Sequence, residues 1–204
     1  NIVSSTSASF ALDVKNPVAG SPAIIVIATT TPATLRLSAS DDNSMQMATS
    51  LDSAMSGATW GSYSANSTIS LGTDPDTVYA QFRDTLANTS TIQSVTTPET
   101  PAYWVFRDIS NVGTNDYKEF VAWKVVADPP QGSFSRYDIL RSTNGTDYSL
   151  LTSIASKATN YYVDSGLTAN QTYYYKVATV DSLGNTSPFS AVVSDNADGQ
   201  GGTD

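Results

Sequence analysis

The feature that most constrains the fold of this chain is a seven-residue segment that occurs twice. It stands at residues 84–90 as DTLANTS and at residues 181–187 as DSLGNTS. Each copy directly follows a run with alternating side chains, at residues 78–83 and 175–180, a pattern typical of strands with one buried face. A repeat that joins a strand to its turn indicates two consecutive modules of related design.

The turn chemistry explains why these residue types recur. Asp84 and Asp181 can each accept hydrogen bonds from backbone N–H groups of the turn, and Gly184 can adopt a positive φ without a Cβ clash. The first copy has Ala87 in place of this glycine. Either the first turn differs in type, or it holds strain on the order of 1 kcal/mol.

The rest of the pattern indicates an all-β protein. A chain of 204 residues fits two domains of about 100 residues each. Short runs rich in Val, Ile, Tyr and Thr alternate with Gly, Pro, Asn and Asp clusters, and no stretch has a helical period. We expect two tandem β-sandwiches: residues 1–96, with 1–22 as a leading or donor strand, and residues 97–194, joined by a short linker containing Pro98 and Pro101. Residues 195–204 are expected to form a flexible Gly/Asp-rich tail.

The first module resembles a bacterial immunoglobulin-like repeat of large surface and secreted proteins. The resemblance covers residues 33–92 and rests on residues 35–41 (LRLSASD), on Trp60, on Leu71 followed by Gly72, and on residues 78–84 (VYAQFRD). It implies an immunoglobulin-like sandwich.

The second module resembles fibronectin type III. Trp123 stands where that family has a core tryptophan, and Leu167 precedes Tyr173 by the spacing of the tyrosine corner. In this corner the phenol hydroxyl bonds to the main chain and fixes the strand entry. The first module has Asp76 at the position equivalent to Tyr173 and therefore lacks this corner.

Composition excludes several functional classes. With no His and no Cys, the chain has no Ser-His or Cys-His pair, no disulfide and no ordinary zinc or haem site. Its Asp residues stand in turns, where solvated capping accounts for them, so we expect no catalytic activity. A net charge of -9 is the reverse of what a nucleic acid attracts, and no apolar stretch is long enough for a membrane span.

Two kinds of ligand remain open. Calcium could be held by loop oxygens of Asp41, Asp42, Asp74 and Asp76, although these acids could equally serve solubility; no other cofactor is expected. Trp60 and Trp104 could stack on a sugar ring, or could pack across strands or between the modules.

Residues 23–28 (AIIVIA) are apolar on both faces, unlike the other strand-like runs. The neighbouring module or residues 1–20 could cover this strand. Alternatively, this segment or residues 7–14 could complete the sandwich of an adjacent copy by strand addition.

These observations favour a non-catalytic, extracellular structural or adhesive segment of a bacterial surface protein, with a strand-exchanging filament subunit as a variant. Its partners would be neighbouring modules, identical subunits, a glycan or a host or cell-surface protein. The alternative is an accessory carbohydrate-binding or spacer module of a secreted polysaccharide-degrading enzyme.

Overall fold

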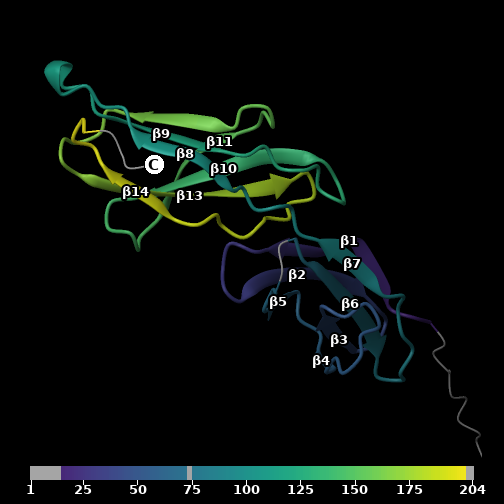
Figure 1. Ribbon diagram of the computed structural model, residues 1–204. Helices are drawn as coiled ribbons and strands as arrows, with labels where there is room; N and C mark the ends of the chain where they lie inside the picture. Colours follow the sequence, from purple (N-terminus) through teal and green to yellow (C-terminus); the bar gives the residue numbers. More distant parts are fainter. Residues whose placement is uncertain (1–14, 73–74, 201–204) are drawn as a thin grey trace, which may run out of the picture.

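The computed structural model describes residues 15–72 and 75–200 and confirms an all-β fold (Figure 1). Within this part of the chain the only helix is a single 3-10 turn, η1 (Val112–Thr114). The strands of the first module are β1 (Val18–Ile27), β2 (Ala33–Ser40), β3 (Met45–Ser50), β4 (Gly61–Ser62), β5 (Asn66–Ile69), β6 (Thr77–Asp84) and β7 (Gln93–Thr96). Those of the second are β8 (Tyr103–Asp108), β9 (Lys118–Trp123), β10 (Phe134–Ser142), β11 (Ser149–Ile154), β12 (Tyr161–Ser165), β13 (Thr172–Asp181) and β14 (Val193–Asn196).

Each module is a sandwich of one three-stranded and one four-stranded antiparallel sheet. The sheets of the first module have the orders β1-β2-β5 and β4-β3-β6-β7. Those of the second have the orders β8-β9-β12 and β11-β10-β13-β14. The strand orders correspond one to one, so the repeated turn belongs to a repeated fold.

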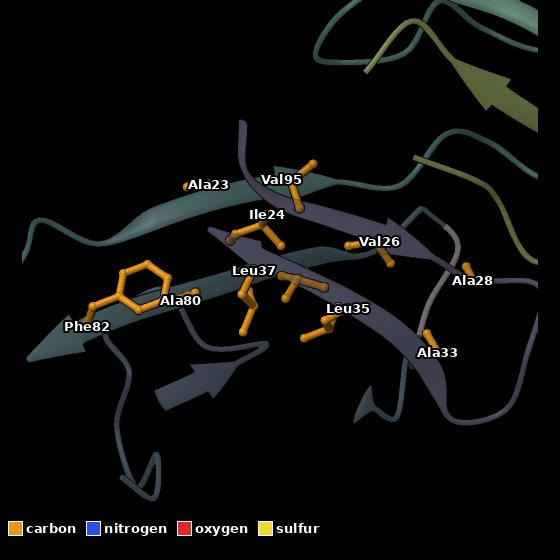
Figure 2. Packing of buried hydrophobic residues seen from close by; sticks show 11 residues of the cluster. Ala23, Ile24, Val26, Ala28, Ala33, Leu35, Leu37, Ala80, Phe82 and Val95 are labelled. Atoms are coloured by element: carbon orange, nitrogen blue, oxygen red, sulfur yellow. The ribbon is translucent and has the colours of Figure 1, made fainter. Parts of the chain in front are cut away.

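The alternation that predicted strands also places the core residues. On β6 the side chains of Val78, Ala80 and Phe82 are fully buried, and Figure 2 shows Ala80 and Phe82 packed beneath β1 and β2. In the second module Trp123 is fully buried, and its ring centroid lies 5.1 Å from that of Tyr137. Both modules therefore have apolar cores of their own.

The apolar strand β1 completes the sandwich in which it begins. Ile24, Val26 and Ala28 are buried in the core of the first module (Figure 2). The strand pairs with β2 on both sides of an irregularity between Ala19 and Ile24. In this arrangement residues 23–28 are not free for exchange with another copy. The other candidate donor segment, residues 7–14, lies outside the described residues.

Residues 195–200 do not form the flexible tail that their composition predicts. β14 continues through Asn196, Ala197 is fully buried in the second core, and the backbone N–H of Gly199 donates to Asp108 at 2.6 Å. Residues 195–200 were predicted as flexible from their composition, but their backbone hydrogen bonds and the buried Ala197 make them part of the module.

Candidate functional site

The 181–187 turn is organised around the buried carboxylate of Asp181. Its Oδ1 accepts hydrogen bonds from the backbone N–H groups of Leu183 (2.9 Å) and Asn185 (2.8 Å), and its Oδ2 accepts one from Asn185 Nδ2 (2.7 Å). Gly184 has a φ of 92°, which favours glycine. These contacts hold the Asn185 side chain in one orientation, with its remaining acceptor, Oδ1, directed out of the turn.

That acceptor binds the first module. Asn185 Oδ1 accepts from the N–H of Val26 at 2.9 Å, the N–H of Thr186 donates to the Val26 carbonyl at 2.9 Å, and Thr186 Oγ1 accepts from the N–H of Ala28 at 2.8 Å. Thr186 thereby forms a parallel bridge with Ile27. The turn of the second module thus pairs with the end of β1, and in Figure 2 its olive trace approaches the Ala28 end of this strand.

This contact accounts for the apolar sequence of residues 23–28. Ile25 and Ile27, which do not face the core, are only partly exposed, and a Cβ on Gly184 would lie 3.9 Å from Ile25 Cγ2. The neighbouring module therefore supplies part of the cover, as one of the two intramolecular alternatives predicted.

The linker between the modules is bonded at both ends. The N–H of Thr97 donates to the Asp76 carbonyl at 2.8 Å, on the first module. On the second module, Glu99 Oε2 accepts from the N–H of Ala127 at 2.7 Å, and Thr100 Oγ1 donates to the Pro188 carbonyl at 3.3 Å. Only a few residues between these bonds can change conformation, which restricts bending at the junction.

The three calcium candidates that the structure describes, Asp41, Asp42 and Asp76, do not belong to a group of acidic side chains that could hold a metal ion. Asp41 Oδ1 accepts from the N–H groups of Asp42 and Asn43, and Asp42 pairs with Lys15. Asp74 lies outside the described residues. Among residues 15–72 and 75–200, no three acidic side chains are grouped so that they could hold a metal ion.

Asp76 instead replaces the tyrosine of the corner. In the second module the hydroxyl of Tyr173 accepts from the N–H of Thr168 at 2.9 Å, as the spacing from Leu167 predicted. In the first module the carboxylate of Asp76 accepts from the N–H of Gly72, the residue that follows Leu71 as Thr168 follows Leu167. The first module lacks the tyrosine but retains the bond.

The two aromatic candidates differ in exposure. Trp60 is half-buried, and the guanidinium of Arg83 lies over its ring at 4.3 Å. Trp104 is 70% exposed and follows Tyr103 at an irregularity in the pairing of β8 with β9. On the same three-stranded sheet, exposed Tyr161 stacks on Phe120 with centroids 5.8 Å apart. The exposed aromatic side chains of the β8-β9-β12 sheet are therefore Trp104 and Tyr161, whereas the Phe120 ring also has the guanidinium of Arg107 over it at 5.7 Å.

Sequence analysis missed a buried acid in the second module. Glu119 is fully buried, and neither carboxyl oxygen has a hydrogen-bond partner. Desolvation, with the negative charge of Asp108 as the next contribution, raises the pKa of Glu119 to about 8. The side chain is therefore largely neutral at pH 7. The available signal was its alternation with Val121 and Trp123, which places Glu119 on the inward face of β9.

No helix in the described part of the chain is long and apolar enough to cross a membrane.

Comparison with known proteins gives one curated relative, Exoglucanase B of Cellulomonas fimi, which is 31% identical over 104 residues. The match covers 51% of this chain and 9% of that protein, so the chain spans a small part of its relative. No family model matches.

Solved structures similar to this chain contain fibronectin type III domains. The sixth such domain of human fibronectin type III domain containing protein 3 has a TM-score of 0.39 and 19% identity, covering 52% of this chain and 92% of that one. The FN1–FN3 domains of chicken CNTN1 have a TM-score of 0.40 and 10% identity, covering 86% and 66%. These similarities concern the fold alone.

Proposed function

We propose that this chain is a non-catalytic, rigid two-module spacer within a larger secreted protein. The observation that carries the proposal is the junction, where three hydrogen bonds of 2.8 to 2.9 Å join β1 to the 181–187 turn. A linker alone fixes distance, whereas a linker together with strand pairing fixes orientation. The chain would set the separation and direction of the parts attached to it.

The relative named an exoglucanase supports a particular setting for this spacer. We infer that the larger protein degrades a polysaccharide and that the two modules connect its working parts. A segment of a bacterial surface protein would use the same junction for the same mechanical purpose. A relative of known activity that matches over most of its length would decide between these two settings.

The junction can be tested with a matched pair of variants. Asn185→Ala removes both a turn contact and the bond to Val26, whereas Asn88→Ala removes the corresponding turn contact without touching the junction. Small-angle scattering and residual dipolar couplings should give one inter-module orientation for the wild type and for Asn88→Ala, and a broad distribution for Asn185→Ala. A broad distribution in the wild type would refute the rigid spacer.

A second function, binding of a glycan, is favoured by the exposure of Trp104 on β8, in the same sheet as the exposed Tyr161 on β12. Aromatic faces stack on sugar rings because the apolar face of the ring loses contact with water. Affinity electrophoresis in gels containing soluble β-glucan should then retard the wild type, and Trp104→Ala should abolish the retardation. Trp60→Ala is the control, because Arg83 already covers that ring; equal mobility of all three proteins on a range of glycans would eliminate this function.

A further inference from the structure

A segment at the end of the second module connects the two sheets of its sandwich. We call residues 195–199 the C-terminal strap; it comprises the end of β14 and the bend that follows. Ala197 is fully buried, and its backbone bonds to the loop at residues 170–171, at 2.9 and 3.2 Å. The N–H of Gly199 donates to Asp108 on β8 at 2.6 Å. The strap therefore runs from the four-stranded sheet to the three-stranded sheet.

Glu119 lies within a group of acids to which the strap contributes two. Desolvation, followed by the negative charges of four carboxylates, raises the pKa of Glu119 to about 8. These carboxylates are Asp108 on β8, Asp164 on β12, and Asp195 and Asp198 of the strap. Arg141 on β10 and the hydroxyl of Tyr175 on β13 supply a cation and a donor, but both bind Asp164. Within the described part of the chain neither oxygen of Glu119 has a hydrogen-bond partner, so its ionisation would leave a buried charge uncompensated.

Two side-chain oxygens of the strap itself are also buried and unsatisfied. Asp195 Oδ2 and Asn196 Oδ1 have no hydrogen-bond partner among the described residues. A buried polar atom in this state carries a desolvation cost that is recovered when water reaches it. The bound strap is therefore favoured by the burial of Ala197 and by its backbone bonds, and disfavoured by these two oxygens.

The strap is the element near Glu119 that can open at the least cost. β9, which carries Glu119, is paired on both sides by β8 and β12, and β13 lies between β10 and β14. β14 is the edge strand of its sheet, and the strap is the end of this strand. Edge segments with few backbone bonds open locally before a whole domain unfolds. An ionised Glu119 would therefore displace the strap, with its two negative charges, rather than either of its sheet neighbours.

We propose that the C-terminal strap is a pH-sensitive element, which stays bound while Glu119 is protonated and is released when Glu119 ionises. Release would let water reach Glu119 and the two unsatisfied oxygens, and would uncover Ala197. In a spacer, the direction in which the polypeptide leaves the second module would then be fixed at acidic pH and free at alkaline pH. This consequence rests on the proposed spacer function, whereas the release itself does not.

The direction of the pH effect follows from the two states of Glu119. Its pKa is about 8 with the strap bound, and it returns toward the ordinary value of 4.5 when release exposes the carboxyl group to water. Because the bound state holds the proton more tightly, the equilibrium constant for opening rises about tenfold per pH unit between these two values and levels off above them.

Amide hydrogen exchange, measured by NMR on the full chain between pH 5 and pH 8, tests the proposal. The reporters are the N–H groups of Ala197 and Gly199 in the strap, and the reference is the N–H of Val177, which donates to Ser190 Oγ in the core at 2.9 Å. Glu119→Gln is the matched variant, since its side chain has nearly the same shape and cannot ionise. The ratio of wild-type to variant rates at one amide cancels the intrinsic acceleration of exchange by hydroxide.

We expect this ratio to rise about tenfold per pH unit at Ala197 and Gly199, and both amides to exchange at least about tenfold faster than Val177. A ratio that does not change with pH overturns the proposal, because opening would then be independent of Glu119. Equal exchange rates at the strap and at Val177 also overturn it, because the strap would then open only when the whole module unfolds.

A second variant keeps the proposal testable if Glu119→Gln does not fold. Asp198→Asn removes one of the negative charges that raise the pKa of Glu119, so the rise in strap exchange should end at a lower pH than in the wild type. Asp128→Asn changes the net charge equally at an exposed acid outside this group and is the control. If all three proteins reach the same upper limit, the proposal is wrong. The spacer function is tested separately by the inter-module orientation, which depends on the bonds of Val26 and Ala28.

Discussion

The two modules share a strand order, but one layer of buried residues in the three-stranded sheet is apolar in the first module and acidic in the second. In the first module Ala33, on β2, is buried and pairs with the partly buried Ile69 on β5. In the second, Glu119 on β9 stands between its cross-strand neighbours Asp108 and Asp164, and all three acids are buried. One fold therefore tolerates either an apolar or an acidic layer at this place.

The three acids of this layer differ in their hydrogen-bond partners, and this difference allows them to be buried together. Asp164 accepts from Arg141 at 2.9 Å and from the Tyr175 hydroxyl at 2.8 Å, and Asp108 accepts from the N–H of Gly199. Glu119 has no such donor, and it remains buried because its raised pKa keeps it protonated. The stability of the second module therefore depends on the protonation of Glu119, whereas the equivalent layer of the first module is stabilised by apolar burial alone.

The largest expected effect is therefore a loss of stability of the second module as the pH rises from about 4.5 to about 8. The pKa of Glu119 is about 8 in the folded protein, against an ordinary value of 4.5 in the unfolded chain. Because the folded state binds the proton more tightly, the free energy of unfolding is highest below pH 4.5 and falls as the pH rises to about 8, then levels off. The slope inside this window is about 1.4 kcal/mol per pH unit, to be measured by denaturant unfolding at pH 5, 7 and 9.

Glu119→Gln provides the control for this prediction, since the amide cannot ionise. We expect the variant to lose the slope in that window while the transition of the first module stays unchanged. An identical pH dependence in wild type and variant would show that Glu119 is not the group responsible.

A smaller effect is expected at the two corners. Tyr173→Phe leaves the N–H of Thr168 without its acceptor, and Asp76→Ala does the same for the N–H of Gly72. Each should lower the free energy of unfolding of its own module by about 1 to 3 kcal/mol. Asp76→Asn retains an acceptor and should cost less than Asp76→Ala; if the two cost the same, the corner bond of the first module has no role in stability.

The smallest effect is expected from the strained residue of the first turn. Ala87 has a φ of 68°, in the left-handed region where a Cβ is unfavourable, as Gly184 has in the second turn. Of the two alternatives predicted for the first turn, a different turn type and backbone strain, the structure therefore shows strain. Ala87→Gly should raise the free energy of unfolding of the first module by about 0.5 to 1 kcal/mol, after allowance for the greater freedom of glycine in the unfolded chain. Thermal unfolding of this variant beside Gly184→Ala, which should change in the opposite direction, checks the assignment; a drop in both would contradict it.

Features of local period and spacing could be predicted from the sequence. The inward faces of β6 and β13, the buried Trp123 and the bond made by Tyr173 all follow from alternation or from a fixed separation along the chain. The equivalence of Asp84 and Asp181 was visible for the same reason.

Features that depend on contacts between distant segments could not be predicted. A carboxylate can cap a solvated turn, bind a cation or replace a phenol, and only the position of Gly72 assigns the last role to Asp76. The apolar sequence of residues 23–28 predicted that both faces of this strand are covered. It could not identify the 181–187 turn as the segment that covers one of them. Trp60 and Trp104 looked alike until Arg83 was found over one of them.

The junction also sets an order of events during synthesis. Val26 bonds to Asn185, which lies 159 positions further along the chain, so a ribosome must complete nearly the whole of both sandwiches before this contact can form. Until then the edge of β1 that later binds the 181–187 turn faces water. The N–H groups of Val26 and Ala28 and the side chain of Ile25 are then uncovered. A nascent chain therefore exposes an unpaired strand edge that the folded protein covers.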